Sequence, residues 1–197
     1  RTGILAKDAL ELKPFLIDLY EEFHDADDVR ILCEGAQGFE LDIDWGDYPY
    51  VTSSHCVAAS ALLNGIPPQA VRNIWGVGKV YDTYVGLKNF EPSDPIFSEL
   101  RAAGEEYGAT TGRPRQCNWL DLDALNRSLK INGATHMVLN KIDVLRKVNR
   151  WSLKHHGKIK DFVSQKQMCD YIIDNTPFKH NASNVLFSGN KHNLNLT

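Results

Sequence analysis

The sequence lacks long apolar runs, cysteine pairs and an excess of charge of either sign. No stretch reaches the ~20 uninterrupted apolar residues that span a bilayer, so no membrane partner is predicted. The 22 basic and 25 acidic residues leave a net charge of −3, too small for a field that would attract nucleic acid. The four cysteines form no Cys-x-x-Cys pair, which argues against a disulfide framework and against a zinc site.

Signals for secretion and for disorder are also missing. The N-terminal Arg-Thr-Gly-Ile has no signal-peptide profile, so a reduced, cytoplasmic protein is expected. With 43% apolar and 24% charged residues, the composition is that of a globular chain. We expect one domain over residues 1–197. Because the first residue is Arg1 and not Met, we expect this domain to be part of a longer chain.

Short β-branched segments alternate with segments of helical periodicity. Strands are expected at 29–33, 71–85, 135–139 and 184–187. Helices are expected at 13–24, 53–63, 94–107, 121–133 and 160–174. Several of these strands stop at a polar or glycine-rich turn. The alternation predicts an α/β fold with ligand-binding loops along one edge of its sheet.

The turn Asn-Lys-Ile-Asp at 140–143 follows an apolar strand and is the sharpest local signal. Asp143 can accept two hydrogen bonds from the N1–H and 2-amino groups of guanine, while the stem of Lys141 covers the face of the base. Ser188 and Gly189 follow another short strand and would form a second guanine-side loop. The alternative is an ordinary solvated turn.

The loop Gly108–Arg115 combines hydroxyls and guanidinium groups on a segment punctuated by glycine. Arg113 and Arg115 can bind phosphate or carboxylate in a bidentate manner. The hydroxyls of Thr110 and Thr111, together with free backbone N–H groups, would complete an anion site. The alternative is an exposed basic loop.

Three further features are interpreted from their neighbours in the sequence. A glycine-rich turn presents Gln37, whose amide both donates and accepts hydrogen bonds. Asp42 and Asp44 are interpreted as a solvated turn, because no third metal ligand accompanies them. His155 and His156 lie in a basic stretch and are interpreted as solvated surface residues. No metal ligand is therefore assigned within this chain.

Taken together, these motifs resemble the adenylosuccinate synthetase family in order and spacing. The resemblance covers most of residues 1–145, and the segments that carry it are 1–4, 34–38, 41–44 with Gly46, 48–54, 108–115, 119–121 and 140–145. The resemblance implies an α/β fold with a mixed or parallel sheet, similar to that of the P-loop GTPases. It also implies that this sequence is the carboxyl-terminal portion of that fold.

The resemblance implies a ligase of purine nucleotide biosynthesis. Members of this family join L-aspartate to inosine monophosphate (IMP) at the expense of GTP, through a 6-phosphoryl-IMP intermediate. The products are adenylosuccinate, GDP and phosphate. The expected partners are IMP, L-aspartate, GTP and Mg²⁺, and a cytoplasmic homodimer is expected.

The resemblance also implies roles for residues on the IMP side. Gln37 would be the catalytic residue, lying beside the 6-oxo position and steadying the phosphorylated intermediate. Thr52 would hold the 5′-phosphate, and the backbone at Val85 would meet the ribose. Arg113 would lie near the ribose hydroxyl. Arg1 would reach the phosphate of the nucleotide bound by the partner subunit.

The aspartate and GTP sides are assigned in the same way. The aspartate carboxylates would be bound by Thr110, Thr111 and Arg113. The residues expected to bind GTP are Arg115 at the phosphates and Lys141, Asp143, Ser188 and Gly189 at the guanine.

The sequence departs from the family pattern in three ways. The phosphate loop, catalytic aspartate and catalytic histidine of the family precede the segment that matches Arg1, so the Mg²⁺ ligands are expected upstream and these 197 residues alone are expected to be inactive. Tyr84 stands where an arginine is expected, and the Pro-Phe-Pro-Thr-Glu segment that usually follows Val85-Gly86 is absent. Only about fifty residues follow Leu145, as in compact members of the family.

Two alternatives stay open, the first of which is motivated by this compactness. The first is a viral-type relative that condenses aspartate with deoxyguanylate (dGMP), although the intact Thr-Thr-Gly-Arg segment ending at Arg113 favours a ribonucleotide. The second is a guanine-nucleotide-binding module without ligase activity.

Overall fold

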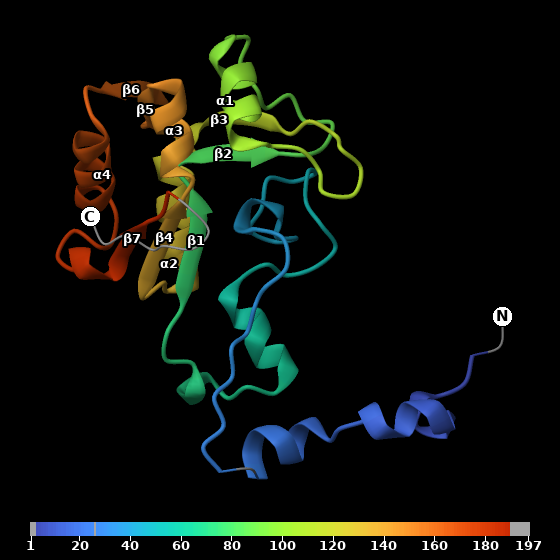
Figure 1. Cartoon of the computed structure of the whole chain (residues 1–197). Helices are drawn as coiled ribbons and strands as arrows, with labels where there is room; N and C mark the ends of the chain where they lie inside the picture. The colour runs from blue at the N-terminus through green and yellow to red at the C-terminus, as the bar shows by residue number, and fades with distance from the viewer. Residues whose placement is uncertain (1–2, 26, 190–197) are drawn as a thin grey trace.

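The computed structural model describes residues 3–25 and 27–189, and it contains two β-sheets (Figure 1). One is a parallel sheet in the order β1 (Trp75–Lys79), β4 (His136–Asn140), β7 (Val185–Phe187). The other has the order β2 (Tyr81–Tyr84), β3 (Gln116–Asp121), β5 (Trp151–His155), β6 (Lys158–Phe162). In this second sheet only the β3–β5 pair is parallel. The predicted α/β class with mixed and parallel pairing is confirmed.

Four α-helices accompany the sheets in the described residues, namely α1 (Ile96–Gly104), α2 (Leu122–Asn132), α3 (Ile142–Val148) and α4 (Gln165–Asp174). Asp121 caps α2, because its side chain accepts hydrogen bonds from the backbone N–H groups of Asp123 and Ala124. The helix ends at Gly133, which has a φ of 61°. Both ends agree with the prediction. Across the described residues, no helix combines the length and the apolarity needed to cross a membrane.

Shorter turns of helix complete the described chain. They are 3₁₀ turns at Ala6–Asp8, Leu10–Phe15, Phe39–Leu41, Ala58–Asn64, Pro68–Ala70 and Ala182–Asn184, and one π turn at Glu21–Asp25. The helix expected at 53–63 is therefore a 3₁₀ helix that begins five residues later than predicted.

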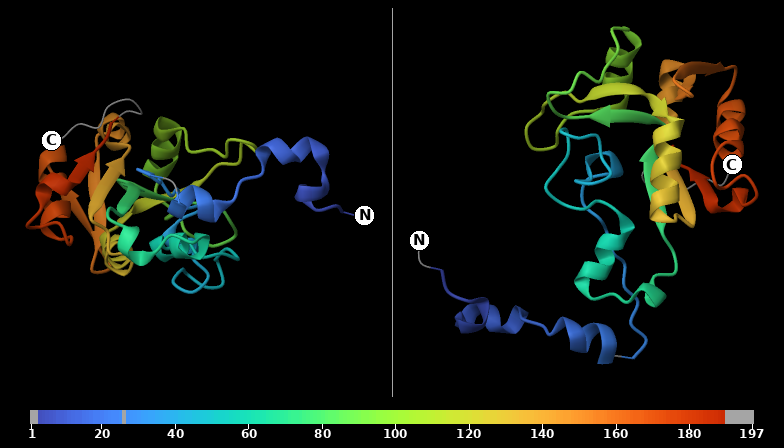
Figure 2. Two further views of the ribbon diagram at one scale, coloured as in Figure 1. Left: turned by 90° about the horizontal axis from the view of Figure 1, so that it is seen from below. Right: turned by 180° about the vertical axis from the view of Figure 1, so that it is seen from behind.

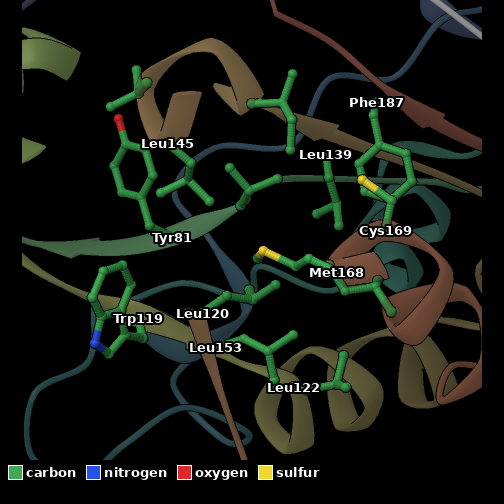
Figure 3. Close-up of a cluster of buried hydrophobic side chains, with 14 of the residues drawn as sticks. Tyr81, Trp119, Leu120, Leu122, Leu139, Leu145, Leu153, Met168, Cys169 and Phe187 are labelled. Carbon is green, nitrogen blue, oxygen red and sulfur yellow. The ribbon is translucent and has the colours of Figure 1, made fainter. Parts of the chain in front are cut away.

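The two sheets share one hydrophobic core (Figure 3). Tyr81 from β2, Leu139 from β4 and Leu153 from β5 are fully buried, and so is Met168 from α4. A single residue, the fully buried Val80, separates β1 from β2. The chain therefore leaves one sheet and enters the other at that point, and the predicted single strand 71–85 is two strands.

Two elements near the carboxyl end differ from the prediction. The expected helix 160–174 begins only at Gln165, because residues 158–162 form β6. Strand β6 pairs with β5 in a hairpin whose turn contains His156 and Gly157, with φ values of 52° and 71°. Four of the five side chains of β6 are exposed, so the strand has no buried face that could reveal it in the sequence.

The N-terminal segment also differs from the prediction. The expected amphipathic helix 13–24 is replaced by short 3₁₀ and π turns, and the expected strand 29–33 does not form within the described residues. Figure 2 shows this segment extending away from the rest of the molecule. Phe15 and Leu19 are 78% and 51% exposed, respectively. A short amphipathic helix draws most of its stability from the packing of its apolar face. In residues 13–24 this packing is absent from the described chain.

Truncation of the core should destabilise the protein strongly. Leu139→Ala removes a fully buried side chain from the central strand of the parallel sheet. We expect the free energy of unfolding, measured by urea denaturation, to fall by about 2–5 kcal/mol. Leu87→Ala, at a side chain that is 99% exposed, should change it by less than about 0.5 kcal/mol. Equal effects of the two substitutions would contradict this description of the core.

Candidate functional site

The carboxyl ends of β1, β4 and β7 lie at one edge of the parallel sheet. The turn after β4 and the turn after β7 meet there through their backbones. The N–H of Ser188 donates to the carbonyl of Leu139 at 2.9 Å, and the N–H of Ile142 donates to the carbonyl of Ser188 at 3.1 Å. These hydrogen bonds fix the two turns against each other.

Gly189 lies directly against Asp143. A β-carbon at this glycine would lie 3.3 Å from Ile142 Cγ2 and 3.5 Å from Asp143 Cβ. A larger residue would therefore push against the turn that carries Asp143. The structure places the two predicted guanine-side turns side by side, and their role in reading guanine stays a prediction.

The side chains of Lys141 and Asp143 make contacts with different parts of the molecule. Lys141 has a φ of 68°, and its Nζ donates to the carbonyl of Gly104 at 2.8 Å. That carbonyl ends α1, where the helix dipole favours a cation. The Asp143 carboxylate lies in the first turn of α3, 3.6 Å from Lys147 Nζ, and its side chain is 31% exposed. Asp143 is thus partly open to a ligand.

A buried carboxylate, Glu106, lies just beyond α1 and was missed by sequence reasoning. It is 3% exposed and accepts hydrogen bonds from Lys79 Nζ at 2.9 and 3.0 Å and from the Tyr81 hydroxyl at 2.7 Å. Arg115 Nη1 lies 3.5 Å away. Burial raises the pKa of Glu106, but the bonds from Tyr81 and Lys79 outweigh it and hold this pKa below its ordinary value. Glu106 is therefore ionised at neutral pH.

The position of Lys79 was the one available signal for this cluster, because a lysine at the carboxyl end of an apolar strand is unusual. Nothing in the sequence pairs it with a carboxylate 27 residues away. Burial is the largest effect on the pKa of Lys79 and lowers it, although the Glu106 carboxylate opposes that change.

The arginine loop, which is the segment Gly108–Arg115, is anchored at Arg115 and closed by a backbone hydrogen bond between two of its own residues. The N–H of Arg115 donates to the Glu106 carbonyl at 2.9 Å, and its own carbonyl accepts from Arg101 Nε at 2.7 Å. The Nε atom of Arg115 is buried and has no hydrogen-bond partner among the described residues. Gly108 and Arg113 pair through a backbone hydrogen bond of 2.8 Å, and Arg113 is exposed. Its exposed neighbours in the loop are Thr110 and Thr111.

Gln37, Thr52 and Val85, which are predicted on the IMP side, belong to other segments of the chain. Gln37 is exposed and has a φ of 66°. Thr52 is half-buried, and its backbone N–H donates to the Leu41 carbonyl at 2.8 Å. Val85 is 54% exposed at the end of β2. No side-chain hydrogen bond within the described chain joins Gln37 or Thr52 to the arginine loop, and Arg1 lies outside the described residues.

The interpretation of Asp42 as a solvated residue was wrong. It is fully buried, and its Oδ1 accepts from the N–H groups of Asp44 and Trp45 at 2.9 Å each. Its Oδ2 accepts from the N–H of Cys56 at 2.5 Å. Burial raises the pKa of Asp42, but these backbone hydrogen bonds outweigh it and leave the pKa below its ordinary value. The carboxylate thus closes the loop that carries Thr52.

The interpretation of His155 as a solvated residue was also wrong. Its side chain is only 9% exposed, because the β5–β6 hairpin packs it against α4, where its Nδ1 lies 2.7 Å from the Tyr171 hydroxyl. His156, with a side chain 79% exposed, is solvated as predicted.

The fold defines an α/β protein whose parallel sheet gathers polar loops at its carboxyl edge, the usual place for a ligand in this class. The family model described as adenylosuccinate synthetase matches residues 4–181. The chain belongs to the adenylosuccinate synthetase family.

Relatives and solved structures agree with this assignment. The chain is 46% identical over 142 residues to the chloroplastic adenylosuccinate synthetase of Chlamydomonas reinhardtii. This alignment covers 70% of this chain and 31% of the relative. It is 48% identical over 142 residues to the adenylosuccinate synthetase of Lodderomyces elongisporus, covering 70% of this chain and 33% of the relative. The fully ligated Plasmodium falciparum enzyme superposes with a TM-score of 0.58 at 37% identity, over 66% of this chain and 33% of that one.

A second solved structure supports the fold alone. The succinoaminodeoxyadenylate synthetase of cyanophage S-2L, bound to dGMP and dATP, matches with a TM-score of 0.53 at 19% identity, over 79% of this chain and 42% of that one. In all, the chain spans about a third of the length of the curated relatives that it matches.

Asp42→Asn should destabilise the protein and change how its stability depends on pH. We expect a loss of about 1–3 kcal/mol at pH 7, because the amide offers one acceptor oxygen where the carboxylate offers two. The folded pKa of Asp42 is lowered, so its contribution is present above the unfolded pKa of about 3.9 and is lost as the pH falls through the folded value. Urea denaturation between pH 7 and pH 2 measures both effects.

Asp44→Asn is the matched control for this experiment, since the Asp44 side chain is 67% exposed and its carboxylate accepts no backbone hydrogen bond within the described residues. It should leave stability almost unchanged. If Asp42→Asn were as stable as Asp44→Asn across this pH range, the proposed clamp on the loop would be wrong.

Proposed function

We propose that the protein to which this chain belongs joins L-aspartate to IMP with hydrolysis of GTP, giving adenylosuccinate, GDP and phosphate. One observation carries the proposal on the structural side. The turn of Lys141 and Asp143 lies against Gly189 at the carboxyl edge of the parallel sheet, and Lys141 links that turn to the end of α1. The family assignment gives the reaction class.

The proposed chemistry proceeds in two displacements. The 6-oxygen of IMP attacks the γ-phosphorus of GTP as N1 of the base gives up its proton, and GDP leaves with the electrons of the broken P–O bond. The amine of aspartate then attacks C6, inorganic phosphate leaves, and the amine loses a proton. Negative charge accumulates on the transferring phosphoryl group in the first step, which preorganised cations stabilise.

Residues of this chain have separate tasks in the proposal. Arg115, held by the Glu106 carboxylate, presents its guanidinium group to the GTP phosphates. Asp143 accepts hydrogen bonds from N1–H and the 2-amino group of guanine, and Lys141 lies along the base. Arg113, with the exposed hydroxyls of the loop, binds the carboxylates of aspartate. Gln37 holds the 6-oxo position of IMP.

Assignments on the nucleotide-monophosphate side follow the family pattern. Thr52 binds the 5′-phosphate of IMP, Val85 meets the ribose through its backbone, and Arg1 serves the neighbouring subunit of a homodimer. The exposed apolar residues Phe15 and Leu19 fit a segment that is covered in an assembly. Mg²⁺ supplies charge neutralisation at the phosphates, and none of the residues named here is assigned to it. A cytoplasmic location is part of the proposal.

Turnover by the full-length protein tests the function directly. We expect phosphate release that requires GTP, L-aspartate and IMP together, and much slower release when dGMP replaces IMP. Release that needs dGMP, and does not occur with IMP, would establish the viral-type reaction instead. GTP binding without any aspartate-dependent reaction would establish a binding module.

Asp143→Asn tests the guanine assignment in the same protein. An amide loses one acceptor and turns a donor toward the donor edge of guanine, so KM for GTP should rise by about 10- to 100-fold. Xanthosine triphosphate, which has an acceptor at position 2, should become a better substrate. Steady-state phosphate release with each triphosphate measures both changes.

Asp174→Asn, at an exposed carboxylate on α4, is the control and should leave both KM values unchanged. If Asp143→Asn left the preference for GTP over xanthosine triphosphate unchanged, Asp143 would not read the base.

A further inference from the structure

A cavity of about 640 Å³ lies between α2 and the turn that joins β5 to β6, and none of the residues of the sheet edge described above lines it. Among its lining residues are Asp123 and Asn126 from α2 and both His155 and His156 from the hairpin. The proposed ligase reaction uses none of these side chains.

The hairpin turn brings two adjacent histidines to the same side. Neighbouring residues in a strand point to opposite faces, but His156 has a φ of 52° and begins the turn with Gly157. Its ring consequently stacks on that of His155, with centroids 3.8 Å apart and planes at 24°. His155 Nε2 and His156 Nδ1 lie 3.6 and 3.3 Å, respectively, from Asp123 Oδ1.

We propose that Asp123, His155 and His156 bind a zinc ion. Zn²⁺ binds imidazole nitrogen and carboxylate oxygen at about 2.0–2.2 Å in tetrahedral geometry, which sets its ligand atoms about 3.3–3.6 Å apart. The two nitrogen-to-oxygen distances fall in this range. Two imidazoles and one carboxylate favour zinc over Mg²⁺ or Ca²⁺, which prefer oxygen ligands.

The three ligand groups are oriented by neighbours that are not ligands. The backbone N–H of His156 donates to Asp123 Oδ2 at 2.6 Å and leaves Oδ1 for the metal. The Tyr171 hydroxyl lies 2.7 Å from His155 Nδ1, so that the ring can donate there and keep a lone pair on Nε2. Coordination in the plane of both rings requires one ring to turn, and His156 has room because it is 79% exposed.

Asn126 supplies an independent indication of a ligand in this cavity. Its Oδ1 atom is buried and accepts no hydrogen bond from any described residue, while its Nδ2 donates to the Asn175 carbonyl at 2.7 Å. Asn126 lies three residues after Asp123, on the same face of α2. With three protein ligands, zinc keeps its fourth position for water, and that water can donate to Asn126 Oδ1.

Two cations also line the cavity and limit the affinity. Arg127 and Lys130 are exposed, so solvent and salt screen their repulsion of a metal ion. The guanidinium of Arg127 lies over the ring of Phe39, 5.8 Å from its centroid.

Zinc titration of the full protein without nucleotides, in competition with a chromophoric chelator, tests the site. We expect one equivalent to bind. His156→Asn, chosen because asparagine tolerates a positive φ, and Asp123→Asn should each weaken this binding at least about tenfold. Tyr171→Phe should keep the stoichiometry and weaken binding by about 10-fold. Co²⁺ should give the visible absorption of a tetrahedral ion in the unmodified protein.

His180→Ala, at an exposed histidine outside the cavity, is the control and should bind as the unmodified protein does. Circular dichroism checks that every variant is folded, and folded His156→Asn suffices for the test because its side chain is exposed. Absence of zinc binding to the unmodified protein, or equal affinity in all folded variants, overturns the proposal. Neither result bears on the ligase reaction, which is measured separately.

Discussion

A buried carboxylate, Glu106, is the interaction on which the candidate site depends. Removing an ion from water costs several kcal/mol unless close partners compensate for it. Its partners come from three segments: Lys79 ends β1, Tyr81 begins β2, and Arg115 closes the arginine loop. The ionised Glu106 side chain is stable only when these partners are in place. The position of the arginine loop is therefore coupled to the residues at which the chain passes from β1 in one sheet to β2 in the other.

The crossing at Val80 explains why the polar loops gather at one edge. Its N–H donates to the carbonyl of Asn140, directly before the Lys141 turn, so the end of β1 is fixed against the end of β4. Parallel strands place their carboxyl ends together, and the turn after β7 joins them. Lys141 then bonds to the end of α1, two residues before Glu106. The turn of Lys141 and Asp143 and the arginine loop are thus connected through the same set of hydrogen bonds.

Features set by neighbours in the sequence were predictable, and features set by distant partners were not. The N-cap of α2 at Asp121, its end at Gly133 and the strand before the turn 140–143 depend on local geometry and on burial, and the sequence contains those signals. The exposed strand β6 depends on pairing with β5 and lacks a buried face. The helix expected at 13–24 has a clear apolar periodicity but no surface in the described chain on which to pack it.

The same distinction holds for polar side chains. The motifs around Arg115 and Asp143 are contiguous and were found, whereas Glu106 gains its importance from cations that only the fold brings near. Asp42 was misjudged because a carboxylate binds backbone N–H groups as readily as it binds water, and Cys56 supplies one such group from fourteen residues away. A charged residue can therefore be assigned from sequence only where its partners are adjacent, since burial changes its role from solvated group to structural anchor.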